Sequence, residues 1–303
     1  MDRHDHDHRG AAEHRRPLAI VLAISCTILA AEITGAIISG SLALLADAGH
    51  VLTDAAGLTL ALVAAMLAGR PATAARTWGY RRAEILAAAA QAAVLFAVGI
   101  FVLVEGVRRL IGAPEVHAGP MVAFGIIGLA GNAVAVAVLA RLRSGNLNTR
   151  AALLEVVNDA LGSIAVLIAA GIIAWTGWTR ADAVVSLFIG ALILPRTWKL
   201  LRETVDVLLE SVPKGMDVVG IRTHILGVRH VHDVHDLHVS SVASDLPVLT
   251  AHVVVDESCF HDGHLPSLLD QLQQCLAGHF DVEHSTFQFE PSGHIDHEHA
   301  THA

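Results

Sequence analysis

Long apolar stretches recur along the first two thirds of the chain and stop near residue 200. Each stretch is roughly 20 residues long, the length that an α-helix needs to cross the hydrocarbon core of a bilayer. A helix also satisfies its own backbone polar groups, which lipid cannot do. The pattern therefore predicts six membrane-spanning helices, at residues 18–38, 41–67, 84–106, 119–140, 151–175 and 182–201.

After residue 211 the pattern becomes that of a small folded domain. VHDVHDLHVSS and VLTAHVVVD alternate between apolar and polar residues, as half-buried strands do, whereas LPSLLDQLQQCLA has helical periodicity. The predicted order is a compact αββαβ domain, with helix 215–226, strand 230–240, strand 247–256, helix 261–278 and strand 283–290.

Polar ends rich in histidine and acidic residues flank these two regions. The first end lacks the apolar core and cleavage site of a secretory signal peptide, and such composition suits weak, flexible capture of metal ions. The predicted organisation is a disordered tail at 1–16, a transmembrane domain at 17–211, a cytoplasmic domain at 212–291 and a C-terminal tail at 292–303.

The basic residues between the apolar stretches predict the orientation. The N-terminal tail and the connections at 70–82, 141–150 and 196–202 carry 14 Lys and Arg, against three on the opposite side. By the positive-inside rule, both termini are expected in the cytoplasm. The net charge of −9 disfavours nucleic acid as a partner. The short loops suit a protein of the bacterial inner membrane.

Two of the predicted membrane helices carry acidic and imidazole side chains on one face. Asp47, His50 and Asp54 are spaced i, i+3 and i+7, and Glu155 and Asp159 are one turn apart. Each ionised carboxylate at mid-membrane costs ~2.5 to 3.5 kcal/mol. A divalent cation bound by His50, Asp54, Glu155 and Asp159 would offset that cost and complete a four-ligand shell. Asp47 is expected to support this site as a gate, a proton relay or a partner of a ligand. The alternative is a hydrogen-bonded polar cluster that holds the helices together.

Histidine is unusually frequent, with 20 residues in the chain, ten of them in the predicted cytoplasmic domain. If the first strand is regular, alternation places His230, His232 and His238 on one face and His235 on the other. Not all of them can then join one site. Cysteine is rare and scattered, without a CxxC pair, so that neither a disulfide scaffold nor a cysteine zinc knuckle is indicated.

Four segments, LADAGHVLTD, RTWGYRRAEILAA, NLNTRAALLEVVNDALGS and WTGWTRADAVVSL, resemble the cation diffusion facilitator family of zinc transporters. The resemblance implies that His50 and Asp54 form the transport site with Glu155 and Asp159. Zinc-selective members usually have histidine at the position of Glu155. An additional oxygen ligand weakens the preference for zinc, so cobalt, cadmium, manganese and iron are also candidate substrates.

The resemblance also extends to the cytoplasmic domain, which in the family is a small αββαβ, ferredoxin-like fold that dimerises and often binds metal. HDLHV, TAHVVVD and HSTFQFEP would supply the ligands His235, His252 and Glu290, with His261 or His264 completing the site.

The sequence thus predicts a secondary active transporter rather than an enzyme. It would export Zn²⁺, or Co²⁺ or Cd²⁺, in exchange for protons, and so serve metal homeostasis and resistance as a homodimer in the bilayer. No ATP-handling motif such as GxxxxGK[ST] and no organic cofactor motif is found in the sequence. A membrane metallohydrolase and a metal-sensing receptor are the competing interpretations. The first lacks an HExxH motif, and buried ligand pairs on two helices argue against the second.

Overall fold

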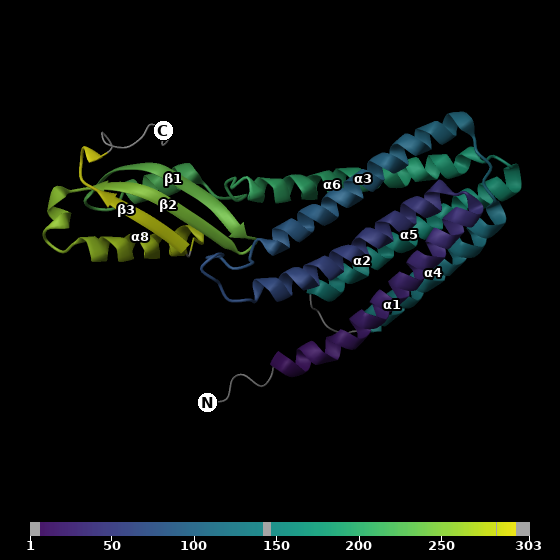
Figure 1. Ribbon diagram of the computed structural model, residues 1–303, viewed down its shortest axis with the longest axis horizontal. Coiled ribbons are helices and arrows are strands. Elements are labelled where there is room, and N and C mark those ends of the chain that lie inside the picture. The colour runs from purple at the N-terminus through teal and green to yellow at the C-terminus, as the bar shows by residue number, and fades with distance from the viewer. Residues whose placement is uncertain (1–6, 142–146, 283, 295–303) are drawn as a thin grey trace. The chain divides into compact units, whose positions relative to one another are not determined.

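The computed structural model describes residues 7–141, 147–282 and 284–294 (Figure 1). Internal contacts divide the chain into two compact units, one made of residues 1–60 and 90–200 and the other of residues 61–89 and 201–303. Within the described residues, six helices are long and apolar enough to cross a membrane, which confirms the predicted number. They are α1 (Asp7–Ser39), α2 (Leu42–Ala68), α3 (Ala83–Gly112), α4 (Ala118–Arg141), α5 (Leu147–Thr176) and α6 (Arg180–Leu208).

The N-terminal end differs from the disordered tail expected at 1–16, because α1 already begins at Asp7. This stretch contains Ala11, Ala12 and Glu13, which are strong helix formers. The prediction for residues 1–6, and most of that for the C-terminal tail, falls outside the described residues.

Glycines bring the membrane helices close together. A Cβ added to Gly35 of α1 would lie 2.6 Å from the side chain of Phe124 on α4. A Cβ on Gly99 of α3 would lie 2.8 Å from Leu194 of α6, and Figure 1 shows these two helices side by side. Small residues at such crossings allow the backbones to pack tightly, which is how helices associate in lipid.

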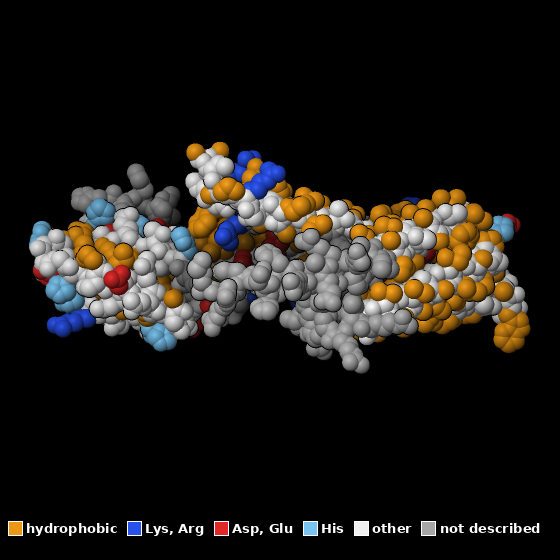
Figure 2. Space-filling model, turned by 90° about the horizontal axis from the view of Figure 1, so that it is seen from below, with side chains coloured by type: hydrophobic (Ala, Val, Ile, Leu, Met, Phe, Trp, Pro, Cys, Tyr) orange, Lys and Arg blue, Asp and Glu red, His pale blue; other side chains and the backbone are white. Residues whose placement is uncertain are grey.

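The outer surface of the helices is apolar. Large hydrophobic side chains such as Ile111 and Trp175 are 81% and 92% exposed, and Figure 2 shows hydrophobic side chains covering much of this part of the molecule. A soluble protein rarely exposes so extensive an apolar surface. Together with the six long apolar helices, this surface identifies an integral membrane protein.

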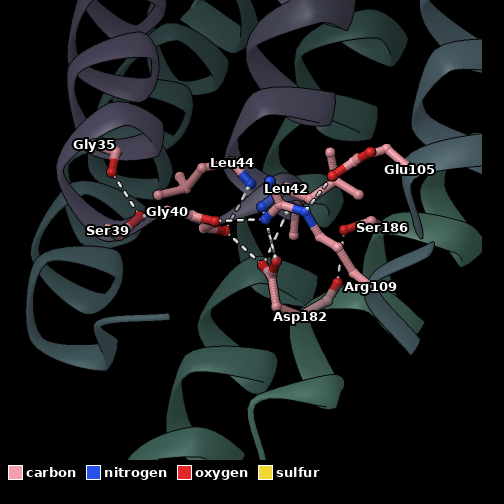
Figure 3. Close-up of polar contacts among 11 residues, drawn as sticks. Gly35, Ser39, Gly40, Leu42, Leu44, Glu105, Arg109, Asp182 and Ser186 are labelled. Atoms are coloured by element: carbon pink, nitrogen blue, oxygen red, sulfur yellow. Dashed lines mark hydrogen bonds and ion pairs between the residues drawn. The ribbon is translucent and has the colours of Figure 1, made fainter. Parts of the chain in front are cut away.

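The start of α2 is held by Asp182 of α6, which is 1% exposed (Figure 3). Its carboxylate accepts hydrogen bonds from the Ser41 hydroxyl (2.5 Å) and from the backbone N–H groups of Leu42 (2.7 Å) and Ala43 (3.2 Å). Arg109 of α3 lies 3.9 Å from the same carboxylate. Asp182 therefore accepts hydrogen bonds from backbone N–H groups that have no partner within α2. Its negative charge also lies at the N-terminus of α2, where the helix dipole is positive.

The small domain contains α7 (Val218–Leu226), β1 (Val231–Ala243), β2 (Leu246–Val255), the short 3₁₀ helix η1 (Glu257–Phe260), α8 (Leu265–Phe280) and β3 (His284–Glu290). The sheet order is β1-β2-β3, with β1 antiparallel and β3 parallel to β2. This confirms the predicted αββαβ fold. Both helices pack on one face of the sheet, and the core contains Ile221, Ile225, Val234, Val239, Leu249, Val253, Leu268, Leu272 and Leu276.

Two details of this domain differ from the predictions. The second helix was expected from residue 261, but α8 begins at Leu265. Gly263 has φ +81°, a left-handed conformation that an α-helix cannot contain, and Pro266 favours the first turn. Residues 261–264 therefore form a turn rather than helix.

The second difference is a β-bulge in β1. His235 pairs with His252 and His238 with Thr250, so three steps along β1 match two along β2. The extra residue reverses the alternation: Val234 and Val239 both lie in the core although they are five positions apart. His238, next to Val239, consequently lies on the same face as His235, and the prediction that they occupy opposite faces was wrong.

Candidate metal sites

Three of the predicted membrane ligands lie together, drawn from two helices. His50 and Asp54 are one turn apart on α2, and the distance between His50 Nε2 and Asp54 Oδ2 is 3.4 Å. Asp159 of α5 places Oδ1 3.7 Å from the same imidazole nitrogen. One ligand atom from each residue lies within 4.8 Å of the other two. Side chains that are far apart in the sequence thus place their ligand atoms close enough together to bind one metal ion.

Several polar atoms of this group are buried without a hydrogen-bond partner. They are His50 Nδ1, Asp54 Oδ2 and Asp159 Oδ1. Almost all buried polar atoms in proteins are hydrogen-bonded, so three such atoms in one cluster require an explanation. A divalent cation would satisfy the two carboxylate oxygens directly, and an imidazole with two carboxylates is a donor set suited to zinc and similar ions.

Glu155 is not one of the three residues in this group. It lies one turn before Asp159 on α5 and its side chain is exposed, yet its charge is near enough to act on His50 and Asp54. Arg196 of α6 also acts electrostatically on both. Arg196 lay both in the predicted helix 182–201 and among the basic residues counted for the connection 196–202, and the structure places it within α6.

Asp47 lies outside the three-residue group, in a second buried cluster. Its carboxyl group is hydrogen-bonded with that of Glu32 on α1 and accepts a bond of 3.4 Å from the Ser163 hydroxyl on α5. Asn132 of α4 donates to Ser163 at 3.5 Å. Asp47 therefore joins α2 to α1 and α5 directly and to α4 through Ser163, as in a polar cluster that holds helices together. A role of Asp47 in supporting His50 stays a prediction.

A further group lies on the face of the small sheet that points away from its core. His235 Nε2 is 3.1 Å from Glu290 Oε2, and His252 Nδ1 is 2.8 Å from Glu290 Oε1. These are the three residues that the resemblance implied, and they can share one ion. Asp236, which was not among the predicted ligands, places a carboxylate oxygen 3.5 Å from His252 Nε2. The bulge places it there, with φ +48°.

The structure does not bring His261 or His264 into that group. His264 Nδ1 instead lies 2.8 Å from Asp262, and His261 follows η1 in the turn before α8. At the nearby end of β2, hydrogen bonds from His230 and His232 hold the pKa of Asp256 below its usual value. Histidine–carboxylate pairs thus account for several histidines of this domain.

Comparisons with known proteins agree with this arrangement. Residues 18–209 match the family model described as "Cation efflux transmembrane domain", and residues 213–292 match "Cation efflux protein, cytoplasmic domain". The chain is 42% identical to the metal cation efflux system protein CzcD of Cupriavidus metallidurans, over 95% of this chain and 89% of that protein. It is 38% identical to the zinc transporter ZitB of Escherichia coli, over 95% and 92%.

Two other proteins are also similar. A cadmium, cobalt and zinc/H⁺-K⁺ antiporter of Bacillus velezensis is 34% identical, over 96% of this chain and 93% of that protein. The solved metal-bound C-terminal domain of the CzcD transporter from C. metallidurans is 36% identical, covering 25% of this chain and 99% of its own, with a TM-score of 0.23. From the family models and the full-length relatives, we conclude that the chain belongs to the cation diffusion facilitator family and is an efflux transporter of divalent metal cations.

Proposed function

We propose that the protein exports Zn²⁺, and also Cd²⁺ or Co²⁺, from the cytoplasm in exchange for protons, and that His50, Asp54 and Asp159 hold the ion during transport. The observation that carries this proposal is the convergence of three ligand atoms within 4.8 Å, from two helices, with both carboxylates offering a buried oxygen that lacks a hydrogen-bond partner. Glu155, one turn from Asp159, supplies the fourth ligand once its side chain turns toward the ion.

The donor set determines the range of cations. Zinc is usually bound by four nitrogen, oxygen or sulfur ligands. A shell with one imidazole and three carboxylates is a harder donor set than one with two imidazoles and two carboxylates, so it discriminates less strongly in favour of zinc. One of the relatives is called a zinc transporter, and another a cadmium, cobalt and zinc/H⁺-K⁺ antiporter. These names support zinc as a substrate and are consistent with a broader range.

Proton exchange follows from the same ligands. The imidazole must be neutral and the carboxylates ionised to bind the cation, so protons and metal compete for these groups. Metal loading from the cytoplasm would release protons, and protons arriving from the far side would release the metal. Alternation between the two sides requires rocking of one group of helices against another. One relative, named a cadmium, cobalt and zinc/H⁺-K⁺ antiporter, supports exchange of this kind.

The remaining features fit a regulated dimer in the bacterial inner membrane. The distribution of basic residues supports a cytoplasmic location for both termini, where His235, His252 and Glu290 would bind the same metals and report their concentration. The second family model carries a name that refers to a dimer, which supports a homodimer formed through the small domain. The domain limits proposed here are 17–211 for the transmembrane part and 212–291 for the cytoplasmic part.

The test is transport in reconstituted vesicles that contain a metal-sensitive dye and a pH dye, with an imposed proton gradient. Metal flux should be coupled to proton flux in the opposite direction, and Asp54→Ala or Asp159→Ala should abolish both. Glu105→Gln is the matched control, since Glu105 pairs with Arg109 away from the three ligands. Unchanged metal flux in Asp54→Ala or Asp159→Ala would contradict the site, and metal flux without proton flux would contradict the exchange.

Glu155→His provides a separate test of the fourth ligand. If Glu155 binds the ion, exchanging a carboxylate for an imidazole should raise the transport of zinc relative to manganese and cobalt. The ratio of initial rates for the metals, measured in the same vesicles, checks this. An unchanged ratio would show that Glu155 does not contact the transported ion.

A further inference from the structure

A third group of metal-binding side chains lies on the two helices of the small domain. His224 belongs to α7, and Cys275 and His279 are one turn apart on α8. Cys275 Sγ lies 4.0 Å from His279 Nδ1, and the ring centroids of His224 and His279 are 4.8 Å apart. One ligand atom from each of the three residues lies within 4.8 Å of the others.

The helical periodicity explains why these side chains meet. On α8 the core positions are Leu272 and Leu276, and on α7 they are Ile221 and Ile225. Cys275 and His279 each follow a core-facing position by three residues, and His224 follows one by three as well. They therefore line the edge of the packed surfaces where the two helices approach each other. Cys275 is half-buried and His279 exposed, so that ions in solution can reach the group.

The spacing is close to that of a metal shell. With bonds of about 2.0 Å to nitrogen and 2.3 Å to sulfur, the ligand atoms around tetrahedral zinc lie roughly 3.3 to 3.8 Å apart. The 4.0 Å between Cys275 Sγ and His279 Nδ1 needs only a small side-chain rotation to reach this range. A weak thiol–imidazole hydrogen bond would explain Cys275 and His279, but it would not explain a second imidazole from another helix.

We propose that His224, Cys275 and His279 form a cysteine-containing metal site that takes a borderline or soft divalent cation such as Zn²⁺ or Cd²⁺. On binding, the thiol loses its proton to solvent and the ion gains one thiolate sulfur and two imidazole nitrogens, with water as the fourth ligand. The other two groups offer only nitrogen and oxygen. The thiolate makes this third site the one most selective for soft cations.

The consequence is a cross-link between α7 and α8 that depends on metal. Without metal, α7 and α8 are joined by apolar contacts and by the contact between the His224 and His279 rings. The bound ion would add three coordinate bonds to these contacts. The site therefore responds to cytoplasmic zinc or cadmium separately from the transport site.

The first test is absorption spectroscopy of the full-length protein in detergent micelles, with Co²⁺ added to the metal-free chain. A thiolate-to-cobalt charge-transfer band in the near ultraviolet reports a sulfur ligand directly. The band should appear in the wild type, persist in Cys26→Ser and Cys259→Ser, and disappear in Cys275→Ser. Absence of the band in the wild type, or its persistence in Cys275→Ser, would overturn the proposal. The visible cobalt bands of the sites without cysteine show that the variant is still folded.

The second test identifies the imidazoles. Zn²⁺ at ten times its dissociation constant should slow alkylation of Cys275 about tenfold, because only the unbound fraction reacts. Peptide mass spectrometry measures the rate at this residue. His224→Gln and His279→Gln should each weaken the protection, and the double variant should lose it. Equal alkylation rates with and without Zn²⁺, or full protection in the double variant, would overturn the assignment.

Discussion

Replacing Asp182 with asparagine should weaken the membrane unit at the start of α2. Its carboxylate accepts three hydrogen bonds, two of them from the backbone N–H groups of Leu42 and Ala43, and lies 3.9 Å from the Arg109 guanidinium (Figure 3). Asparagine has nearly the same shape but one acceptor oxygen instead of two. Its amide nitrogen would face the backbone N–H of either Leu42 or Ala43, which then has no acceptor.

The magnitude follows from these contacts. A hydrogen bond to a charged group contributes about 1.5 to 3 kcal/mol, and a buried donor left without a partner costs about 1 to 3 kcal/mol. Glu105 still pairs with Arg109, at 3.1 Å, and limits the cost of the lost charge. The expected decrease in the free energy of unfolding is therefore about 3 kcal/mol, more than a hundredfold in the equilibrium constant.

The assay is reversible unfolding in mixed micelles with an increasing fraction of denaturing detergent, followed by circular dichroism. Ser186→Ala is the matched control, since its hydroxyl donates only to the backbone carbonyl of Asp182 within α6. That change should cost less than about 1 kcal/mol. Equal stability of Asp182→Asn and Ser186→Ala would refute the reasoning that this carboxylate caps α2.

Two further predictions concern the helix contacts and the small domain. Gly35→Ala places a methyl group 2.6 Å from Phe124 and should lower the free energy of unfolding by about 1 to 3 kcal/mol in the same assay. Gly171→Ala is the control, since the space around Gly171 is open, and it should change stability by less than about 1 kcal/mol. Similar effects of the two changes would show that α1 and α4 are not tightly packed. Hydrogen bonds from His230 and His232 lower the pKa of Asp256 in the folded state. The ionised Asp256 therefore stabilises the folded domain fully above the ordinary carboxyl pKa of about 4, and this stabilisation is lost as the pH falls through the lowered pKa. Asp256→Asn should reduce the acid sensitivity of the sheet, measured by hydrogen exchange of the β2 amides at acidic pH, and an unchanged pH profile would contradict this.

The fold could be predicted because its elements follow simple periodicities. Apolar stretches long enough to cross a bilayer leave the backbone few alternatives to a helix, and strand alternation was sufficient to predict β1 and β2. The errors occurred where one residue overrides a pattern. Gly263, with its positive φ, delays α8, and the bulge after His235 reverses the faces of β1. Periodicity averages over several residues and does not register such single positions.

The candidate sites could be predicted in part for a related reason. Helical spacing identifies residues that share one face, so His50 and Asp54 were found together, but it does not say which helices become neighbours. That Asp159 meets this pair was predicted because α5 also carries acidic side chains on one face, and carboxylates buried in the membrane need a cation to neutralise their charge. His224, Cys275 and His279 were missed because their association depends on how α7 and α8 pack, which no local spacing encodes.

The bulge in β1 also determines which changes in chain length the small domain can accept. Deleting one residue between His235 and His238 would leave two steps of β1 opposite two steps of β2, so regular pairing would return while His235, His238 and Val239 kept their faces. A deletion between Val239 and the β1–β2 turn would instead shift the pairing by one residue and turn every side chain on one side of it to the other face. The strand can therefore lose its extra residue, and other natural variation in length is expected at the β1–β2 turn.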